Sequence, residues 1–234
     1  MISPGENISG KVTVHNTSDT PINIRVYWED FRYEPPFDGK KQFLAAGTTS
    51  YSIANWATLS AEKFTLPGFG KRDVDYVINV PSDVRGGYYG VLFFEKSPEE
   101  VTGSHGLSIV ARVGSLFFLE SNDRNKDAAI TDWQVEGDSL KGKFTNKGDV
   151  IAIPKGVFYV MNSEGLAVDR GEIEKLYIPP TESADFLFNL SPDLRAGKYS
   201  AVITFDLNDG DVLVKELSLI KESSGTLSIQ DIKD

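Results

Sequence analysis

Residues 80–94 read VPSDVRGGYYGVLFF, and residues 190–204 read LSPDLRAGKYSAVIT. The two stretches lie 190 − 80 = 110 positions apart and share four identities: Asp83/Asp193, Arg85/Arg195, Gly87/Gly197 and Tyr89/Tyr199. Each stretch ends in an apolar run that is typical of a buried β-strand. A repeat of this kind, with a similar strand after a similar turn, indicates two copies of one folded unit.

A second correspondence lies earlier in each copy. Asn16-Thr17-Ser18-Asp19 matches Asn146-Lys147-Gly148-Asp149 at a spacing of 146 − 16 = 130, so the first copy carries 130 − 110 = 20 extra residues. We expect these residues within the aromatic, Pro- and Gly-containing stretch 29–60. The predicted domains are therefore 1–121 and 122–222, followed by a polar tail at 223–234.

Period-two alternation dominates the chain and predicts β-strands. Residues 21–28 alternate between apolar and polar side chains, and residues 107–119 alternate in the same way. Turn signals such as Asn-Asp-Gly at 208–210 separate the runs. Many short strands between turns are typical of a sandwich, so we predict an all-β protein of two tandem immunoglobulin-like β-sandwich domains.

Tyr89 and Tyr199 each stand at the start of an apolar run. In immunoglobulin-like sandwiches a tyrosine at this place folds over the corner, and its hydroxyl bonds backbone a few residues upstream. Gly87 and Gly197 would relieve crowding at the turn. We therefore interpret both tyrosines as structural corner residues rather than as ligand-binding residues.

The two copies differ at their first strand. The second copy has a candidate strand at 129–135 before its strand at 140–146, whereas the first copy opens with a turn at 2–6. We expect the first sandwich to lack its opening edge strand. Either a native precursor supplies that strand upstream of Met1, or a partner donates a strand to the open edge of domain 1.

The composition argues against catalytic chemistry. The chain has 234 residues, no cysteine and two histidines, and its charge is 24 − 34 = −10. The absence of cysteine excludes disulfides, thiolate metal sites and thiol nucleophiles. The acidic balance disfavours nucleic-acid binding, and no apolar run approaches the roughly 18 residues that span a bilayer. We expect a non-enzymatic protein without metal, cofactor, nucleic-acid partner or membrane span.

Several segments of the first domain resemble a known family: Pro4-Gly5-Glu6, Asn16-Thr17-Ser18-Asp19, Asn55-Trp56, Pro81-Ser82-Asp83 and residues 86–95. On these segments the chain resembles exported bacterial proteins with tandem immunoglobulin-like domains. It is most similar to the WxL-interacting cell-surface proteins, whose first domain is described as peptidoglycan-binding. It is more remotely similar to the PapD-like pilus chaperones. The resemblance implies export to the periplasm or the cell surface, and binding without chemistry.

The similarity to pilus chaperones implies a role for Arg112. Those chaperones anchor the carboxyl terminus of a pilin with basic side chains in the inter-domain cleft. One such side chain lies on the long last strand of domain 1, and Arg112 stands at the matching position. Arginine suits a buried carboxylate because its guanidinium donates two parallel hydrogen bonds. The alternative is that Arg112 forms an ordinary salt bridge on the strand face or between domains.

Aromatic residues are dense in the stretch 29–60, and Tyr33, Phe37 and Trp56 are the candidate binding side chains there. Loops on rigid scaffolds collect binding residues, and aromatic rings with acidic neighbours suit sugar or peptide faces. The alternative is that these rings form a satellite core that covers the sandwich.

Two functions are consistent with these observations. The first is an exported cell-envelope protein that binds other cell-surface proteins or peptidoglycan through its immunoglobulin-like domains. The alternative is a periplasmic pilus-type chaperone that donates strand 107–119 to a client subunit. Only the second function requires co-purification with a subunit whose sheet lacks a strand.

Overall fold

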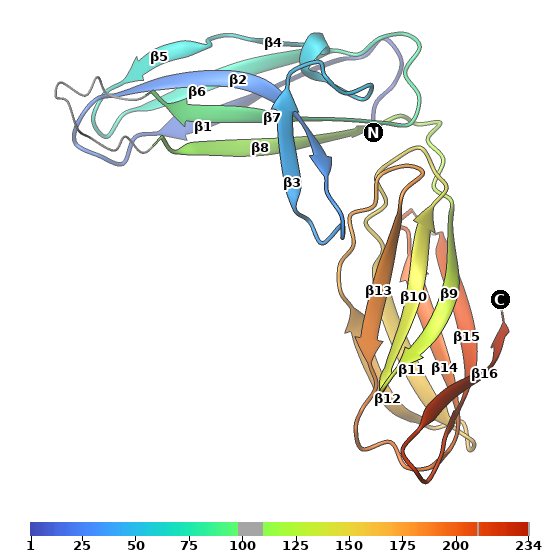
Figure 1. Cartoon of the computed structure of the whole chain (residues 1–234). Helices are drawn as coiled ribbons and strands as arrows, with labels where there is room; N and C mark the ends of the chain where they lie inside the picture. The colour runs from blue at the N-terminus through green and yellow to red at the C-terminus, as the bar shows by residue number, and fades with distance from the viewer. Residues whose placement is uncertain (98–109, 210, 234) are drawn as a thin grey trace. The chain divides into compact units, whose positions relative to one another are not determined.

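The computed structural model describes residues 1–97, 110–209 and 211–233 (Figure 1). The chain divides into two compact units, the first formed by Met1–Arg32 and Gln42–Arg124 and the second by Tyr33–Lys41 and Asn125–Asp234. Each unit contains two β-sheets, which confirms the predicted all-β fold of two sandwiches. Residues 33–41, expected inside an insertion of the first sandwich, group with the second unit instead.

The first unit has a three-stranded sheet in the order β1-β6-β4 and a five-stranded sheet in the order β3-β2-β7-β8, with β5 paired to β2. A short 3₁₀ helix, Ala54–Trp56, precedes β4. Inward side chains of both sheets, such as Trp28, Val74 and Leu92, form its core. The strands are β1 (Asn7–His15), β2 (Ile22–Tyr33), β3 (Lys41–Ala45), β4 (Ala57–Leu59), β5 (Lys63–Leu66), β6 (Lys71–Asn79), β7 (Gly87–Lys96) and β8 (Arg112–Glu120).

The second unit repeats this plan with a three-stranded sheet, β13-β10-β9, and a five-stranded sheet, β12-β11-β14-β15-β16. Leu140, Phe144 and Ile203 are among its fully buried core residues. The strands are β9 (Ala128–Glu136), β10 (Ser139–Asn146), β11 (Lys155–Asn162), β12 (Ala167–Ile173), β13 (Ser183–Asn189), β14 (Gly197–Asp206), β15 (Val212–Lys221) and β16 (Leu227–Lys233).

The C-terminal segment corrects the expectation of a polar tail at 223–234. Residues 227–233 form β16, which pairs antiparallel with β15. Leu227 is buried at the start of this strand, and Ile229 and Ile232 lie opposite Leu219 and Leu217 of β15. A register shift in this pairing interrupts the period-two spacing of the three apolar residues, and the sequence pattern therefore did not indicate a strand.

The two corner tyrosines occupy equivalent places, since Tyr89 is the third residue of β7 and Tyr199 is the third residue of β14. The Tyr199 hydroxyl donates to the backbone carbonyl of Arg195 at 2.8 Å, four residues upstream. Tyr89 is 2% exposed, and its hydroxyl lies so close to Gly87 that a Cβ on that glycine would overlap it. Both rings thus cover the turn that precedes their strand.

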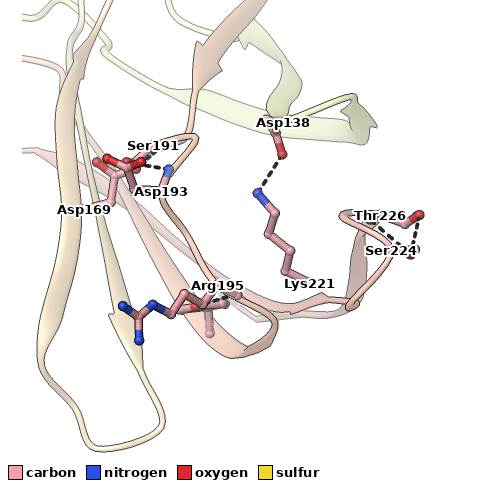
Figure 2. Close-up of polar contacts among 9 residues, drawn as sticks. Asp138, Asp169, Ser191, Asp193, Arg195, Lys221, Ser224 and Thr226 are labelled. Carbon is pink, nitrogen blue, oxygen red and sulfur yellow. Dashed lines mark hydrogen bonds and ion pairs between the residues drawn. The ribbon is translucent and has the colours of Figure 1, made fainter.

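Polar contacts tie the loops around the second corner to neighbouring strands (Figure 2). The Lys221 ammonium, at the end of β15, lies 2.9 Å from the Asp138 carboxylate in the turn before β10. The Ser191 amide donates to the Asp169 carboxylate of β12 at 2.6 Å. The second of these bonds holds Ser191, at the start of the second copy of the repeat.

β1 lies at the edge of its sheet. Within the described residues it pairs with β6 alone, whereas the equivalent strand of the second unit, β10, has β13 on one side and β9 on the other. Ile2 forms one parallel bridge with Ser121, next to the end of β8. The first sandwich therefore differs from the second at the side of β1 that faces away from β6.

Candidate protein-interaction edge

β8 is the outer strand of the larger sheet in the first unit. It begins at Arg112, and residues 107–109 of the predicted strand 107–119 lie outside the described residues. It pairs with β7 without a register shift, from Arg112 opposite Glu95 to Glu120 opposite Gly87. On the other side of β8, the described part of the chain supplies a backbone bond at one end, where the Ile2 amide donates to the Glu120 carbonyl at 2.8 Å.

The pairing determines which backbone groups of β8 remain open. The Ala111 carbonyl accepts from the Lys96 amide beside β7, while the Glu120 carbonyl faces Ile2. Because backbone groups alternate in direction along a strand, odd-numbered residues face β7 and even-numbered residues face the open side. Within the described residues, no backbone partner meets the N–H and C=O groups of four residues on this side: Arg112, Gly114, Leu116 and Phe118.

Apolar side chains flank this open side. Val113 is 74% exposed, and Leu116 and Phe118 are 38% and 37% exposed. Phe117 instead packs in the sandwich, where its ring centroid lies 4.8 Å from that of Trp28. As far as the structure describes the chain, the edge thus combines unpaired backbone with exposed apolar surface, which are the two features used in β-strand addition.

The guanidinium of Arg112 is engaged by side chains of β2 and β7. Its Nη1 lies 3.0 Å from a carboxylate oxygen of Glu29 and 3.3 Å from the Tyr27 hydroxyl. The guanidinium carbon also lies 4.0 Å from the centroid of the Phe93 ring. Tyr27 in turn donates to the Glu95 carboxylate at 2.6 Å. This geometry fits the salt-bridge alternative for Arg112.

The place of Arg112 along β8 argues against the carboxylate anchor. Arg112 is the first residue of β8, whereas the first unit ends at Arg124, beyond the other end of the strand. At about 3.3 Å per residue, the distance from Arg112 to Glu120 is roughly 26 Å. A side chain that anchors a peptide terminus beside the inter-domain connection would have to stand at the Glu120 end.

The electrostatics of this cluster follow from its contacts. Burial, and then the hydrogen bond to Glu95, raise the pKa of the Tyr27 phenol, which therefore stays neutral at ordinary pH. The hydrogen bond with Tyr27, followed by the charge of Glu29, raises the pKa of Arg112. The guanidinium is permanently charged, and Glu29 already balances it, so the cluster offers little free charge to a ligand carboxylate.

The candidate aromatic residues are packed. Tyr33 and Phe37 are 4% and 5% exposed, and the Tyr33 ring stacks on Tyr177 with centroids 4.9 Å apart. The Phe37 carbonyl accepts from the Tyr177 amide at 2.8 Å, so the structure brings these two candidates together in the second unit. Trp56, in the first unit, is partly buried against Tyr88, with centroids 4.5 Å apart. These contacts fit the packing alternative.

Sequence reasoning missed Tyr27 and Glu29 as the partners of Arg112. The alternation in 21–28 predicts that Tyr27 points away from the core. Glu29 lies two residues further on and therefore points to the same side, and this is the indication that the sequence offers. The contact itself depends on the sheet order β2-β7-β8, which brings the two strands to either side of β7. The pattern within one strand does not specify its neighbours.

The described residues contain no cluster of three or more His, Asp or Glu side chains that could hold a metal ion. Over the same residues, no helix has the length and apolar character needed to cross a membrane.

Comparison with protein-family models finds no match to this sequence, and comparison with curated proteins also finds none. The fold is similar to the class 5 fimbriae chaperone CfaA, with a TM-score of 0.53 and 15% identity over 91% of this chain and 92% of that chain. It is also similar to a chain of a chaperone–tip adhesin complex of CFA/I fimbriae biogenesis, with a TM-score of 0.55 and 15% identity over 91% and 92% of the two chains.

At 15% identity these likenesses show the fold alone, which the chain shares with a solved fimbrial chaperone. They agree with the more remote of the two resemblances drawn from the sequence. The resemblance to the WxL-interacting proteins is not shown by these comparisons.

Proposed function

We propose that the protein is a periplasmic, non-enzymatic chaperone of the pilus type that binds an incomplete client subunit along β8. The observation that carries this proposal is the side of β8 that faces away from β7, where four backbone positions meet no partner among residues 1–97, 110–209 and 211–233 and where Val113 is exposed. The two-domain fold shared with fimbrial chaperones supports it.

The proposed binding mode is the addition of β8 to the sheet of the client. In strand addition, main-chain hydrogen bonds supply affinity and alternate side chains supply specificity. β8 can offer its open side without unfolding, because its other side stays paired with β7 along its whole length. Val113 would supply an apolar side chain to a client whose own sheet lacks a strand.

The test is capture of a client from envelope extract by the wild-type protein, Leu116→Pro and Leu116→Ala. The Leu116 amide faces the open side, so proline removes one open donor and no bond to β7, while alanine keeps the donor. We expect a subunit with an incomplete sheet to be captured by the wild-type protein and Leu116→Ala but lost with Leu116→Pro. Equal capture by all three proteins, or capture of proteins with complete sheets only, would contradict the proposal.

The cell-wall function is tested by sedimentation with peptidoglycan. Tyr33 and Phe37, two of the three candidate sugar-binding rings, are buried, so we expect the protein to remain in the supernatant. If the wild-type protein and Leu116→Pro both sediment with peptidoglycan, the result would favour wall binding over client binding.

A further inference from the structure

The five-stranded sheet of the second unit has an outer face, which points away from the core of its sandwich. Side chains alternate between the two faces of a strand, and Phe158, Ile203 and Leu217 of β11, β14 and β15 are buried in the core. Residues an odd number of positions from these three therefore lie on the outer face. Among them are Val157 and Tyr159 of β11, Val202 and Thr204 of β14, and Val214 and Glu216 of β15.

The centre of this outer face is apolar. Tyr159 is 44% exposed and Val214 is 47% exposed. Val157 and Val202, which lie between them, are partly buried. Val157 lies opposite Thr204 and Thr204 lies opposite Val214, so the side chains form one continuous surface across three strands. Exposed apolar surface of this kind is typical of an interaction site.

The outer face of the other sheet in the same unit has a different chemistry. The Lys143 ammonium there lies 2.6 Å from the Asp132 carboxylate, and the Lys141 ammonium lies 3.2 Å from that of Asp185. Charge pairs of this kind are expected where an antiparallel sheet faces water. Of the two outer faces of this sandwich, the five-stranded sheet is therefore the better candidate for contact with another protein.

Charged residues flank the apolar centre on its two sides. One row of directly opposed residues crosses four strands. Arg170 of β12 lies opposite Tyr159, Tyr159 lies opposite Val202, and Val202 lies opposite Glu216 of β15. The row thus has a basic residue at one end, an acidic residue at the other, and two apolar residues between them.

The two end residues are available to another chain. Arg170 is exposed, and within the described residues its guanidinium forms no ion pair. One carboxylate oxygen of Glu216 accepts from the Ser200 hydroxyl at 2.7 Å. Lys233 lies opposite Glu216 in the pairing of β15 with β16, but as far as the structure describes the chain no ion pair joins their side chains. Glu216 therefore keeps a charge that a basic residue of another chain can meet.

A half-turn exchanges the two ends of this row. The midpoint of the row lies between β11 and β14. Rotation by 180° about a line above this midpoint, parallel to the strands, produces a second copy whose Glu216 lies over Arg170 and whose Val202 lies over Tyr159. Sheets that pack face to face lie about 10 Å apart, a distance that an arginine and a glutamate side chain span together.

Rotation about a line perpendicular to the strands gives the other twofold arrangement of two such faces. It places β12 of one copy over β12 of the second, so that Arg170 meets Arg170 and Glu216 meets Glu216. Like charges brought together in an interface cost free energy. The charge pattern of the row therefore favours the first arrangement, in which the face is complementary to itself.

We infer that the protein forms a dimer through the outer face of this sheet, with two Arg170–Glu216 ion pairs around an apolar centre of Val157, Tyr159 and Val202. Four strands and three rows of outer residues give a footprint of roughly 20 Å by 20 Å. This footprint is small for a protein–protein interface, so we expect a weak dimer with a dissociation constant of about 10 μM or more. The dimer uses residues of the second unit alone and does not depend on the client binding proposed above.

The test is sedimentation equilibrium of the full chain between about 1 and 500 μM. We expect the mass of the wild-type protein to rise toward that of a dimer. Arg170→Glu and Glu216→Arg should each weaken self-association by about tenfold or more, because each places like charges at both ends of the row. Glu182→Arg makes the same change in net charge as Glu216→Arg, in the turn before β13. It is the matched control and should associate like the wild-type protein.

A mixture of the two variants shows whether Arg170 and Glu216 meet. Equimolar Arg170→Glu and Glu216→Arg restore an opposite charge at both ends of the row, so we expect the mixture to dimerise at about wild-type strength. This recovery also shows that both variants are folded. A wild-type protein that stays monomeric over the whole range would overturn the inference. Equal association of all the variants, or a mixture that does not recover, would overturn it as well.

Discussion

Asn16 and Asn146 hold equivalent loops in the two sandwiches with equivalent hydrogen bonds. Each side-chain nitrogen donates to the carbonyl four residues on, Thr20 in the first unit and Val150 in the second, both at 2.8 Å. Each side-chain oxygen accepts from the amide two residues on. Asn146 also donates to the Ile178 carbonyl at 2.9 Å. Both residues are buried, so these bonds satisfy backbone groups that water does not reach.

Asn146→Ala should lower the free energy of unfolding of the second unit by about 2–4 kcal/mol, because it leaves buried carbonyl and amide groups without partners. Denaturant titration measures the loss. Asn189→Ala, on an exposed position of β13, is the matched control and should change stability by less than about 1 kcal/mol, because it removes one exposed hydrogen bond from Ser139 and leaves no buried group without a partner. Equal effects of the two substitutions would show that the loop is not held by Asn146.

Gly87→Ala and Gly197→Ala should differ although the two glycines are equivalent in the repeat. A Cβ on Gly87 would overlap the Tyr89 hydroxyl, whereas a Cβ on Gly197 would lie 3.7 Å from Tyr199. We expect the first substitution to destabilise its unit by about 1–3 kcal/mol and the second to cost less than about 0.5 kcal/mol. Calorimetry of each variant measures the shift in Tm, and equal shifts would contradict the different packing of the two corners.

Arg112→Ala should lower the stability of the first unit by about 1 kcal/mol, because it removes packing on Phe93 and a partly exposed ion pair with Glu29. Client capture should stay at the wild-type level. If Arg112 instead anchors a carboxylate of the client, Arg112→Ala should abolish client capture and leave the melting temperature unchanged. Measuring both quantities on one preparation separates the two roles.

Alkaline pH should destabilise the second unit through Tyr33. Burial raises the pKa of the Tyr33 phenol from 10.0 to about 12, so the native state holds this proton more tightly than the unfolded state. The stability that this provides is present below pH 10 and is lost as the pH rises through about 12. Phenolate absorbance against pH should lose its highest-pH component in Tyr33→Phe. A titration curve of unchanged shape would contradict the assignment.

The prediction of the fold rested on local features. The alternation around Trp28 and the turns beside Asn16 and Asn146 are properties of short stretches, because side-chain direction along a strand and turn geometry depend on adjacent residues. The repeat of Tyr89 and Tyr199 then showed that these stretches occur twice. No comparable local signal indicated β16, because the register shift in its pairing breaks the alternation.

A single sequence was therefore enough for the alternating strands, the turns, the duplicated sandwich and the corner tyrosines, although not for β16. Tertiary structure alone decided which strands are neighbours, and with that the partners of Arg112 and the grouping of residues 33–41 with the second unit. The physical reason is that backbone hydrogen bonds are the same for any pair of strands. The order of the strands in a sheet therefore depends on packing between side chains that lie far apart in the chain.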